Sequence, residues 1–146
     1  MNAGPFELSR FRSAQQHAYG TALGELHSGR KESHWIWFVF PQLRGLGQST
    51  MSETYGLDGL GEARAYLADP VLGARLRECV EVMLAHRLLG ASAVLGELDA
   101  MKFRSCLSLF ALADPAEPLF TAALDAFFNG ESDPKTLALL ARRGGA

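Results

Sequence analysis

The chain has 146 residues, of which 48% are hydrophobic and 21% are charged, a composition typical of one compact domain with its own core. Its formal net charge is -2, and acidic and basic residues are interleaved, so the chain has no extended basic field for nucleic acid or anionic lipid. We therefore expect a single domain over residues 1–146 and a small or neutral partner.

Two cysteines, Cys79 and Cys106, each lie in a run with helical apolar spacing, which predicts buried thiols in a reducing compartment rather than a disulfide. The chain has no CxxC or HxxxH spacing, so we expect no metal site and no cofactor. It also has no apolar signal-peptide segment near its start and no run of about 18 apolar residues. These features predict a cytoplasmic protein.

The first predicted helix shows apolar and small residues at three- and four-residue steps over positions 11–26, with Ser9 as its N-cap and Gly29 as its stop. The apolar run over residues 35–40 has the aromatic and β-branched content of a strand, but the chain offers no convincing partner strand. We predict a short buried helix that ends before Pro41, because proline disfavours helix at the preceding residue.

Residues 42–55 form a polar, glycine-rich segment without a clear period, which predicts a functional loop. A short helix is predicted over residues 60–67. A strongly amphipathic helix follows, opened by Asp69 and the proline after it and extending to residue 88 before Gly90.

A capping turn near Ser92 precedes a second strong helix over residues 98–112. Two further helices are predicted over residues 119–128 and 135–142, the last opened by a Ser-Asp-Pro sequence at 132–134. The chain is thus predicted to be all-α, a single compact domain of about six helices. Its core is expected to come mainly from the two strong helices.

The segment over residues 31–49 combines aromatic and polar groups more densely than any other part of the chain. In it, His34 stands beside Trp35 and Trp37, with Lys31 and Glu32 just before it. An imidazole titrates near neutral pH and aromatic walls can hold a flat ligand. His34 and Glu32 are therefore candidate catalytic residues, and Lys31, Trp35 and Trp37 are candidate ligand-binding residues. The alternative is that the histidine only orders the start of a helix.

The second half of this segment is a candidate phosphate site. The planar guanidinium of Arg44 and the backbone amides of Gly45, Gly47 and Ser49 match phosphate oxygens, and Gln42 begins the same loop as a further candidate for ligand binding. The alternative is a solvated loop arginine without a ligand.

Asp99, Lys102 and Ser105 step by three residues and share one helix face. If that face looks toward the aromatic segment, Asp99 is a candidate base or oxocarbenium stabiliser, while Lys102 and Ser105 are candidate ligand-binding residues. The alternative is a surface ion pair worth roughly 0.2–0.5 kcal/mol. Cys106 lies on the apolar side of this helix and is not expected to be a nucleophile.

Three blocks of sequence, over residues 31–49, 66–76 and 99–105, resemble a known family. The chain is similar, from about Phe6 to Leu140, to the bacterial family catalogued as domain of unknown function 1810, whose members are sometimes mislabelled calpastatin. This resemblance implies a mainly helical single domain and carries no established activity.

A more distant resemblance is to the NADAR superfamily, helical proteins linked to ADP-ribose and NAD metabolism whose members cleave N-glycosidic bonds. The order of features is similar: a polar-aromatic block, a helix with spaced proline, leucine, glycine and arginine over residues 70–75, and Met-Lys-Phe at 101–103. Where those relatives carry Ser-Glu-His, this chain reads Ser-His-Trp at 33–35, and Glu32 is the nearest carboxylate.

The resemblance implies an N-glycoside hydrolase acting on a nucleotide or ADP-ribose-type ligand. A carboxylate, Asp99 or Glu32, would stabilise the cationic sugar and activate water, and a tryptophan would stack on the base. Arg44 and Lys102 would hold phosphate. The alternatives are a non-catalytic nucleotide or ADP-ribose-binding domain and a structural or oligomerisation module. A membrane is not an expected partner, nucleic acid is expected only as a modified base or strand end, and the sequence leaves the oligomeric state open.

Overall fold

The computed structural model describes residues 6–143, and within them the chain forms nine helices and no strand. The all-α prediction is confirmed, but the predicted number of about six helices is wrong. The two helices without a predicted counterpart, α3 and α6, are only six and five residues long, too short to show a helical period in the sequence. In chain order the helices are α1 (Ser9–Ser28), α2 (Ile36–Val39), α3 (Thr50–Tyr55), α4 (Leu60–Ala68), α5 (Leu72–Ala85), α6 (Ala91–Leu95), α7 (Glu97–Ala113), α8 (Pro118–Phe128) and α9 (Pro134–Arg142).

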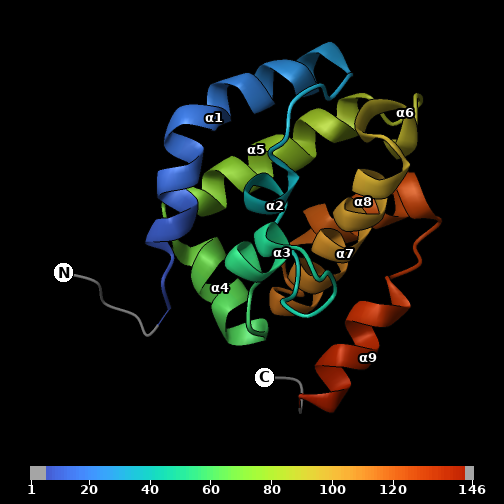
Figure 1. The fold of residues 1–146 in the computed structure, drawn as a ribbon. Helices are drawn as coiled ribbons and strands as arrows, with labels where there is room; N and C mark the ends of the chain where they lie inside the picture. The colour runs from blue at the N-terminus through green and yellow to red at the C-terminus, as the bar shows by residue number, and fades with distance from the viewer. Residues whose placement is uncertain (1–5, 144–146) are drawn as a thin grey trace.

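Helix α7 is the centre of the fold. It packs against α4, α6, α8 and α9, whereas α5 packs against α1, α4 and α8 (Figure 1). Every residue from Ser105 to Phe110 is buried, because neighbouring helices cover α7 on several sides. Both helices that were predicted to build the core contribute to it, α5 through residues such as Leu76 and α7 through residues such as Phe103.

The helix ends follow local capping chemistry in most places. Gly29 ends α1 with a left-handed φ of 76°, as predicted. The predicted N-cap at Ser9 is wrong, because Leu8 holds the cap position and the Ser9 hydroxyl donates to the Glu7 carboxylate at 3.2 Å. The side chain of Asp69 accepts from the backbone N–H groups of residues 71 and 72. Helix α5 itself is shorter than predicted, because it begins later, at Leu72, and ends earlier, at Ala85.

Helix α9 lies on the outside of the molecule beside α7 (Figure 1). It opens as the Ser-Asp-Pro sequence predicts: Pro134 stands in the first turn, and the Asp133 side chain accepts from the Thr136 N–H at 3.1 Å. At its other end, Arg143 donates to the backbone oxygens of Arg44 at 2.7 Å and Asp58 at 3.2 Å. At its start, the Asp133 carboxylate also accepts from Ser105 Oγ of α7 at 2.9 Å, so the helix is held to the body of the domain at both ends.

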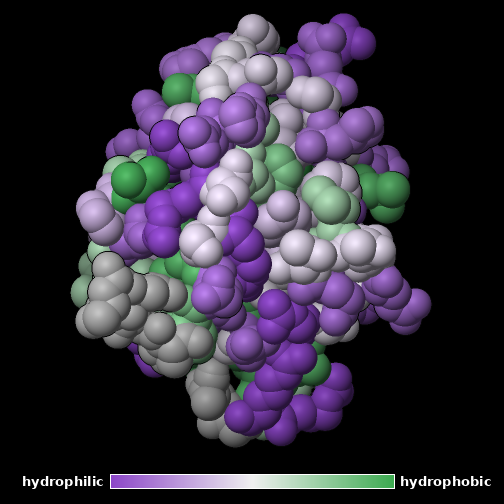
Figure 2. Space-filling view, turned by 60° about the vertical axis from the view of Figure 1, so that its left-hand side comes forward, coloured by the Kyte–Doolittle hydropathy of each residue, from purple (hydrophilic) through white to green (hydrophobic). Residues whose placement is uncertain are grey.

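On the face shown in Figure 2, hydrophilic residues predominate and hydrophobic ones form small, separate patches. Within residues 6–143, no helix combines the length and the hydrophobicity that a membrane span requires. Cys79 and Cys106 are unpaired and buried, as predicted.

Candidate functional site

A groove with a cavity volume of about 280 Å³ opens between the loop after α2, the first turns of α7 and the start of α9. A narrow crevice lined in part by Trp37 adjoins the groove and shares Gln42 and Lys102 with it. Four residues that the sequence predicts as ligand-binding, Gln42, Gly47, Lys102 and Ser105, therefore meet in one place. We call it the α7–α9 groove, and its lining residues are Gln42, Leu46, Gly47, Leu98, Met101, Lys102, Ser105, Asp133 and Lys135.

Two lysines from different helices give the groove its positive charge. Lys102 stands on α7 and Lys135 on the first turn of α9, and both line the cavity. Lys135 is exposed and has no ion-pair partner in the part of the chain that the structure describes. An anionic group in the groove can therefore meet two ammonium groups.

Asp99 connects Lys102 to the segment before α2. One carboxylate oxygen of Asp99 lies 2.7 Å from Lys31 Nζ and the other lies 3.5 Å from Lys102 Nζ. Lys31 is largely buried, donates to the backbone oxygen of Ser33 at 2.7 Å, and lies 5.0 Å above the ring of Trp35. Two ammonium groups share one carboxylate, so this cluster keeps a net positive charge beside the groove. Asp99 itself stands one turn behind Lys102 and does not line the cavity.

The two tryptophans occupy different environments. Trp35 is buried in the core, and its Nε1 donates to the carboxylate of Glu25 at 2.8 Å. Burial alone would raise the pKa of Glu25, but hydrogen bonds from Ser33, from the Glu32 backbone and from Trp35 outweigh it and lower that pKa to about 2. Trp35 thus has no open face for a ligand ring, whereas Trp37 is partly exposed and lines the crevice.

Glu32 and His34 are exposed on the segment before α2. Neither lines the groove or the crevice, and within residues 6–143 neither side chain forms a hydrogen bond or an ion pair. Of the three residues predicted to be catalytic, the structure links only Asp99 to the groove, through Lys102.

The remaining predicted phosphate ligands lie on the far part of the same loop. Arg44 pairs with Asp58, and its backbone oxygen accepts from Arg143. Gly45 has a left-handed φ of 102°, and a Cβ built there would lie 2.9 Å from Arg143 Nη2. Ser49 caps α3. The structure therefore places Arg44, Gly45 and Ser49 in the contacts that shape the loop, outside the groove lining.

Asp133 and Lys135 are the polar groove residues that the sequence did not indicate as ligand-binding. The Asp133 side chain is buried, and one of its oxygens accepts from Ser105 Oγ at 2.9 Å and from Thr136 Oγ1 at 2.6 Å. The sequence predicts Asp133 as a helix cap, but it carries no signal that α9 begins over α7. Only that tertiary contact brings the capping carboxylate and Lys135 to the groove.

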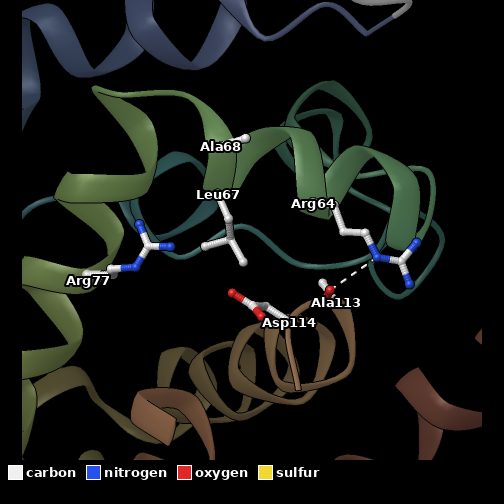
Figure 3. Close-up of a pocket in the computed structure, with 6 residues that line it drawn as sticks. All are labelled: Arg64, Leu67, Ala68, Arg77, Ala113 and Asp114. Atoms are coloured by element: carbon white, nitrogen blue, oxygen red, sulfur yellow. Dashed lines mark hydrogen bonds between the residues drawn. The ribbon is translucent and has the colours of Figure 1, made fainter. Parts of the chain in front are cut away.

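A second cavity of about 300 Å³ lies between α4, α5 and the end of α7 (Figure 3). Its two arginines already have protein partners: Arg64 Nε donates to the backbone oxygen of Ala113 at 3.1 Å, and Arg77 pairs with Glu117 at 3.1 Å. No residue that the sequence predicts for the site lines this cavity. The α7–α9 groove is therefore the stronger candidate.

The buried thiols are poorly suited to nucleophilic chemistry. Burial raises the pKa of Cys79 to about 12 and raises the pKa of Cys106 well above its ordinary value, which keeps both thiols protonated near neutral pH. Within residues 6–143, no group of three or more His, Cys, Asp or Glu side chains is arranged to hold a metal ion.

The fold and the groove define an all-α domain with a positively charged, partly apolar surface site. Over residues 5–140 the chain matches the model of the family described as "Protein of unknown function (DUF1810)", and it belongs to that family. It is similar to the conserved hypothetical protein Rv1873 from Mycobacterium tuberculosis, whose crystal structure aligns with a TM-score of 0.92 at 43% identity over 94% of this chain and 99% of that one. A comparison with curated proteins gives no match.

Proposed function

We propose that the protein binds a nucleotide or ADP-ribose-type ligand in the α7–α9 groove and hydrolyses its N-glycosidic bond. The observation that carries the proposal is the meeting of two lysines, Lys102 and Lys135, with the buried carboxylate of Asp133 on one cavity. The distant likeness to the NADAR superfamily supports the same class of reaction.

The binding part of the proposal rests on charge and shape. Lys102 and Lys135 would hold the phosphates, since ammonium groups bind phosphate oxygens as point charges. Leu46 and Met101 line the same cavity and offer apolar contact to a base or sugar ring. The volume of about 280 Å³ is slightly below the roughly 300–1,000 Å³ of small-molecule sites, so part of the ligand would extend along the open groove.

The catalytic part rests on a fixed negative charge. When an N-glycosidic C–N bond breaks, the base leaves with the electron pair and the sugar becomes an oxocarbenium-like cation. Water attacks this cation, and the proton that the water loses is taken up by the departing base. A preorganised carboxylate lowers the energy of that transition state. We assign this role to Asp133, because hydrogen bonds from Ser105 and Thr136 hold it in place, and we assign the positioning of Lys102 to Asp99.

A non-catalytic binding domain is the second candidate function. One observation favours it: Glu32 and His34, the predicted partners of Asp99 in acid–base chemistry, lie outside the groove lining. This candidate predicts ligand-induced thermal stabilisation without turnover.

The test is incubation of the protein with ADP-ribose, dinucleotides and ADP-ribosylated guanine, with released base measured by chromatography and ligand binding by thermal shift. Hydrolysis should be lost in Asp133→Asn, which retains a capping oxygen, and retained in Asp69→Asn, a matched change at the capping aspartate before α5. Lys102→Ala and Lys135→Ala should each reduce the ligand-induced thermal shift, while the exposed Arg87→Ala should not.

The possible results separate the candidates. Base release that depends on Asp133 supports the hydrolase, and a thermal shift without base release supports the binding domain. Base release that survives Asp133→Asn would contradict the mechanism. No thermal shift with any of these ligands would contradict both candidates and leave a structural module.

A further inference from the structure

The side chain of Gln42 is unusual among the buried polar residues. Gln42 is only 8% exposed, yet within residues 6–143 its amide makes no hydrogen bond. Gln15, the other buried glutamine, shows the ordinary situation, since its Nε2 donates to the backbone oxygen of Phe38 at 2.7 Å and to Tyr66 Oη at 3.1 Å. Buried amide groups are nearly always paired, because burying a donor and an acceptor without partners costs free energy.

The unpaired amide of Gln42 faces the α7–α9 groove. Among the described residues, every polar side-chain atom that is fully shielded from solvent has a hydrogen-bond partner. Since the Gln42 amide has none, its atoms must retain a small solvent-accessible area. Gln42 lines both the crevice and the groove, and the crevice has no room for a water molecule. A Cβ built on Gly47, which borders the groove, would lie 3.9 Å from Gln42 Nε2. The opening is therefore toward the groove, beside the bare backbone of Gly47.

The surroundings of this amide suit a flat ring with a polar edge. Leu46, Leu98 and Met101 line the same groove, and Leu98 and Met101 are 79% and 51% exposed. Such exposed apolar side chains gain from covering by an apolar ligand surface. A planar ring placed against them would direct its edge to the amide, while Lys102 and Lys135 would remain for phosphate.

We infer that Gln42 reads the edge of an adenine-type base and makes the α7–α9 groove selective for adenine nucleotides. A carboxamide presents one donor beside one acceptor, which pairs in a bidentate manner with the amino group of adenine and a neighbouring ring nitrogen. The inference rests on the binding part of the proposed function and names the base; it does not depend on hydrolysis.

The experiment measures binding by calorimetry to the full chain with two ligands, ADP and the diphosphate of purine riboside, which lacks the amino group. The wild type should bind ADP roughly tenfold or more tightly than the analogue, the discrimination expected of one bidentate pair. Gln42→Leu should lose this preference and bind both ligands alike. Gln48→Leu, a matched change at an exposed glutamine of the same loop, should keep the preference.

The stability of the ligand-free variant gives an independent readout. Because Gln42→Leu replaces an unpaired buried amide with an apolar side chain of similar size, its Tm should equal or exceed that of the wild type. A Tm lowered by several degrees would mean that the amide has a structural partner and would overturn the inference. Equal ADP selectivity in the wild type and Gln42→Leu would overturn it while leaving the proposed function intact. Failure of the wild type to bind either diphosphate would overturn both.

Discussion

Glu25, near the end of α1, ties down the segment that carries Lys31. Its Oε1 accepts from the backbone N–H groups of Glu32 at 2.9 Å and Ser33 at 3.0 Å and from Trp35 Nε1 at 2.8 Å, and its Oε2 accepts from Ser33 Oγ at 2.5 Å. We expect Glu25→Gln to destabilise the domain, because a neutral amide cannot accept all four hydrogen bonds and one of its two ends is a donor.

The magnitude follows from the pKa of Glu25. Burial raises this pKa, but the four donors outweigh burial and lower it from 4.5 to about 2. Lowering the pKa from 4.5 to about 2 corresponds to about 3 kcal/mol, and partial exposure of the carboxylate reduces this to about 2 kcal/mol. Since the folded-state pKa is depressed, this stabilisation is present above the unfolded pKa and is lost as the pH falls from about 4.5 toward about 2.

The assay is urea denaturation followed by tryptophan fluorescence at pH 7 and at pH 3. At pH 7 the free energy of unfolding of Glu25→Gln should be lower than that of the wild type by about 2 kcal/mol, and at pH 3 the difference should be clearly smaller. Glu32→Gln, at an exposed neighbouring glutamate, should change stability by less than about 0.5 kcal/mol at either pH. Equal destabilisation by Glu25→Gln at both pH values would refute the assignment of the effect to the ionised carboxylate.

Two further changes test the packing of the site and the core. Asp133→Ala should lower the free energy of unfolding, measured with urea, by about 2 kcal/mol, because the α9 cap and the acceptor for Ser105 are lost. Asp133→Asn should lower it by less than about 1 kcal/mol, and equal losses in the two variants would contradict the capping role. Gly73→Ala should lower the Tm, since the new Cβ would lie 2.2 Å from the backbone oxygen of Leu67. Gly20→Ala, whose Cβ would meet open space on α1, should raise the Tm. A Tm unchanged by Gly73→Ala would contradict this prediction and show that the α4–α5 turn can relax.

The longer helices were predictable because their signals are local. The apolar spacing along α1, α5 and α7 and the capping sequences at Gly29 and Asp133 depend only on neighbouring residues. The short helix α2 was predictable for a different reason: its apolar run is compatible with a strand, but the chain offers no strand to pair with it. Helices α3 and α6 are too short for periodicity, and packing rather than propensity stabilises such elements.

The candidate site was predictable only in part. Four of the predicted ligand-binding residues line the groove, although they come from two distant segments: Gln42, Gly47, Lys102 and Ser105. Trp35 shows why residue type is insufficient: the sequence makes it a candidate stacking residue, but its indole pairs with Glu25 and its ring is buried. Whether a polar or aromatic side chain meets a ligand depends on which partners the fold places beside it.

By itself, the sequence determined the helical class, most helix boundaries and the composition of the core, since these depend on interactions within a few residues along the chain. Tertiary structure alone decided that the start of α9 lies over α7, which brings Asp133 and Lys135 to the groove beside Lys102. It also decided that the Gln15 amide is hydrogen-bonded, whereas the Gln42 amide has no hydrogen bond within residues 6–143. Both outcomes depend on contacts between distant segments, whose distances and directions are set by the packing of the whole domain.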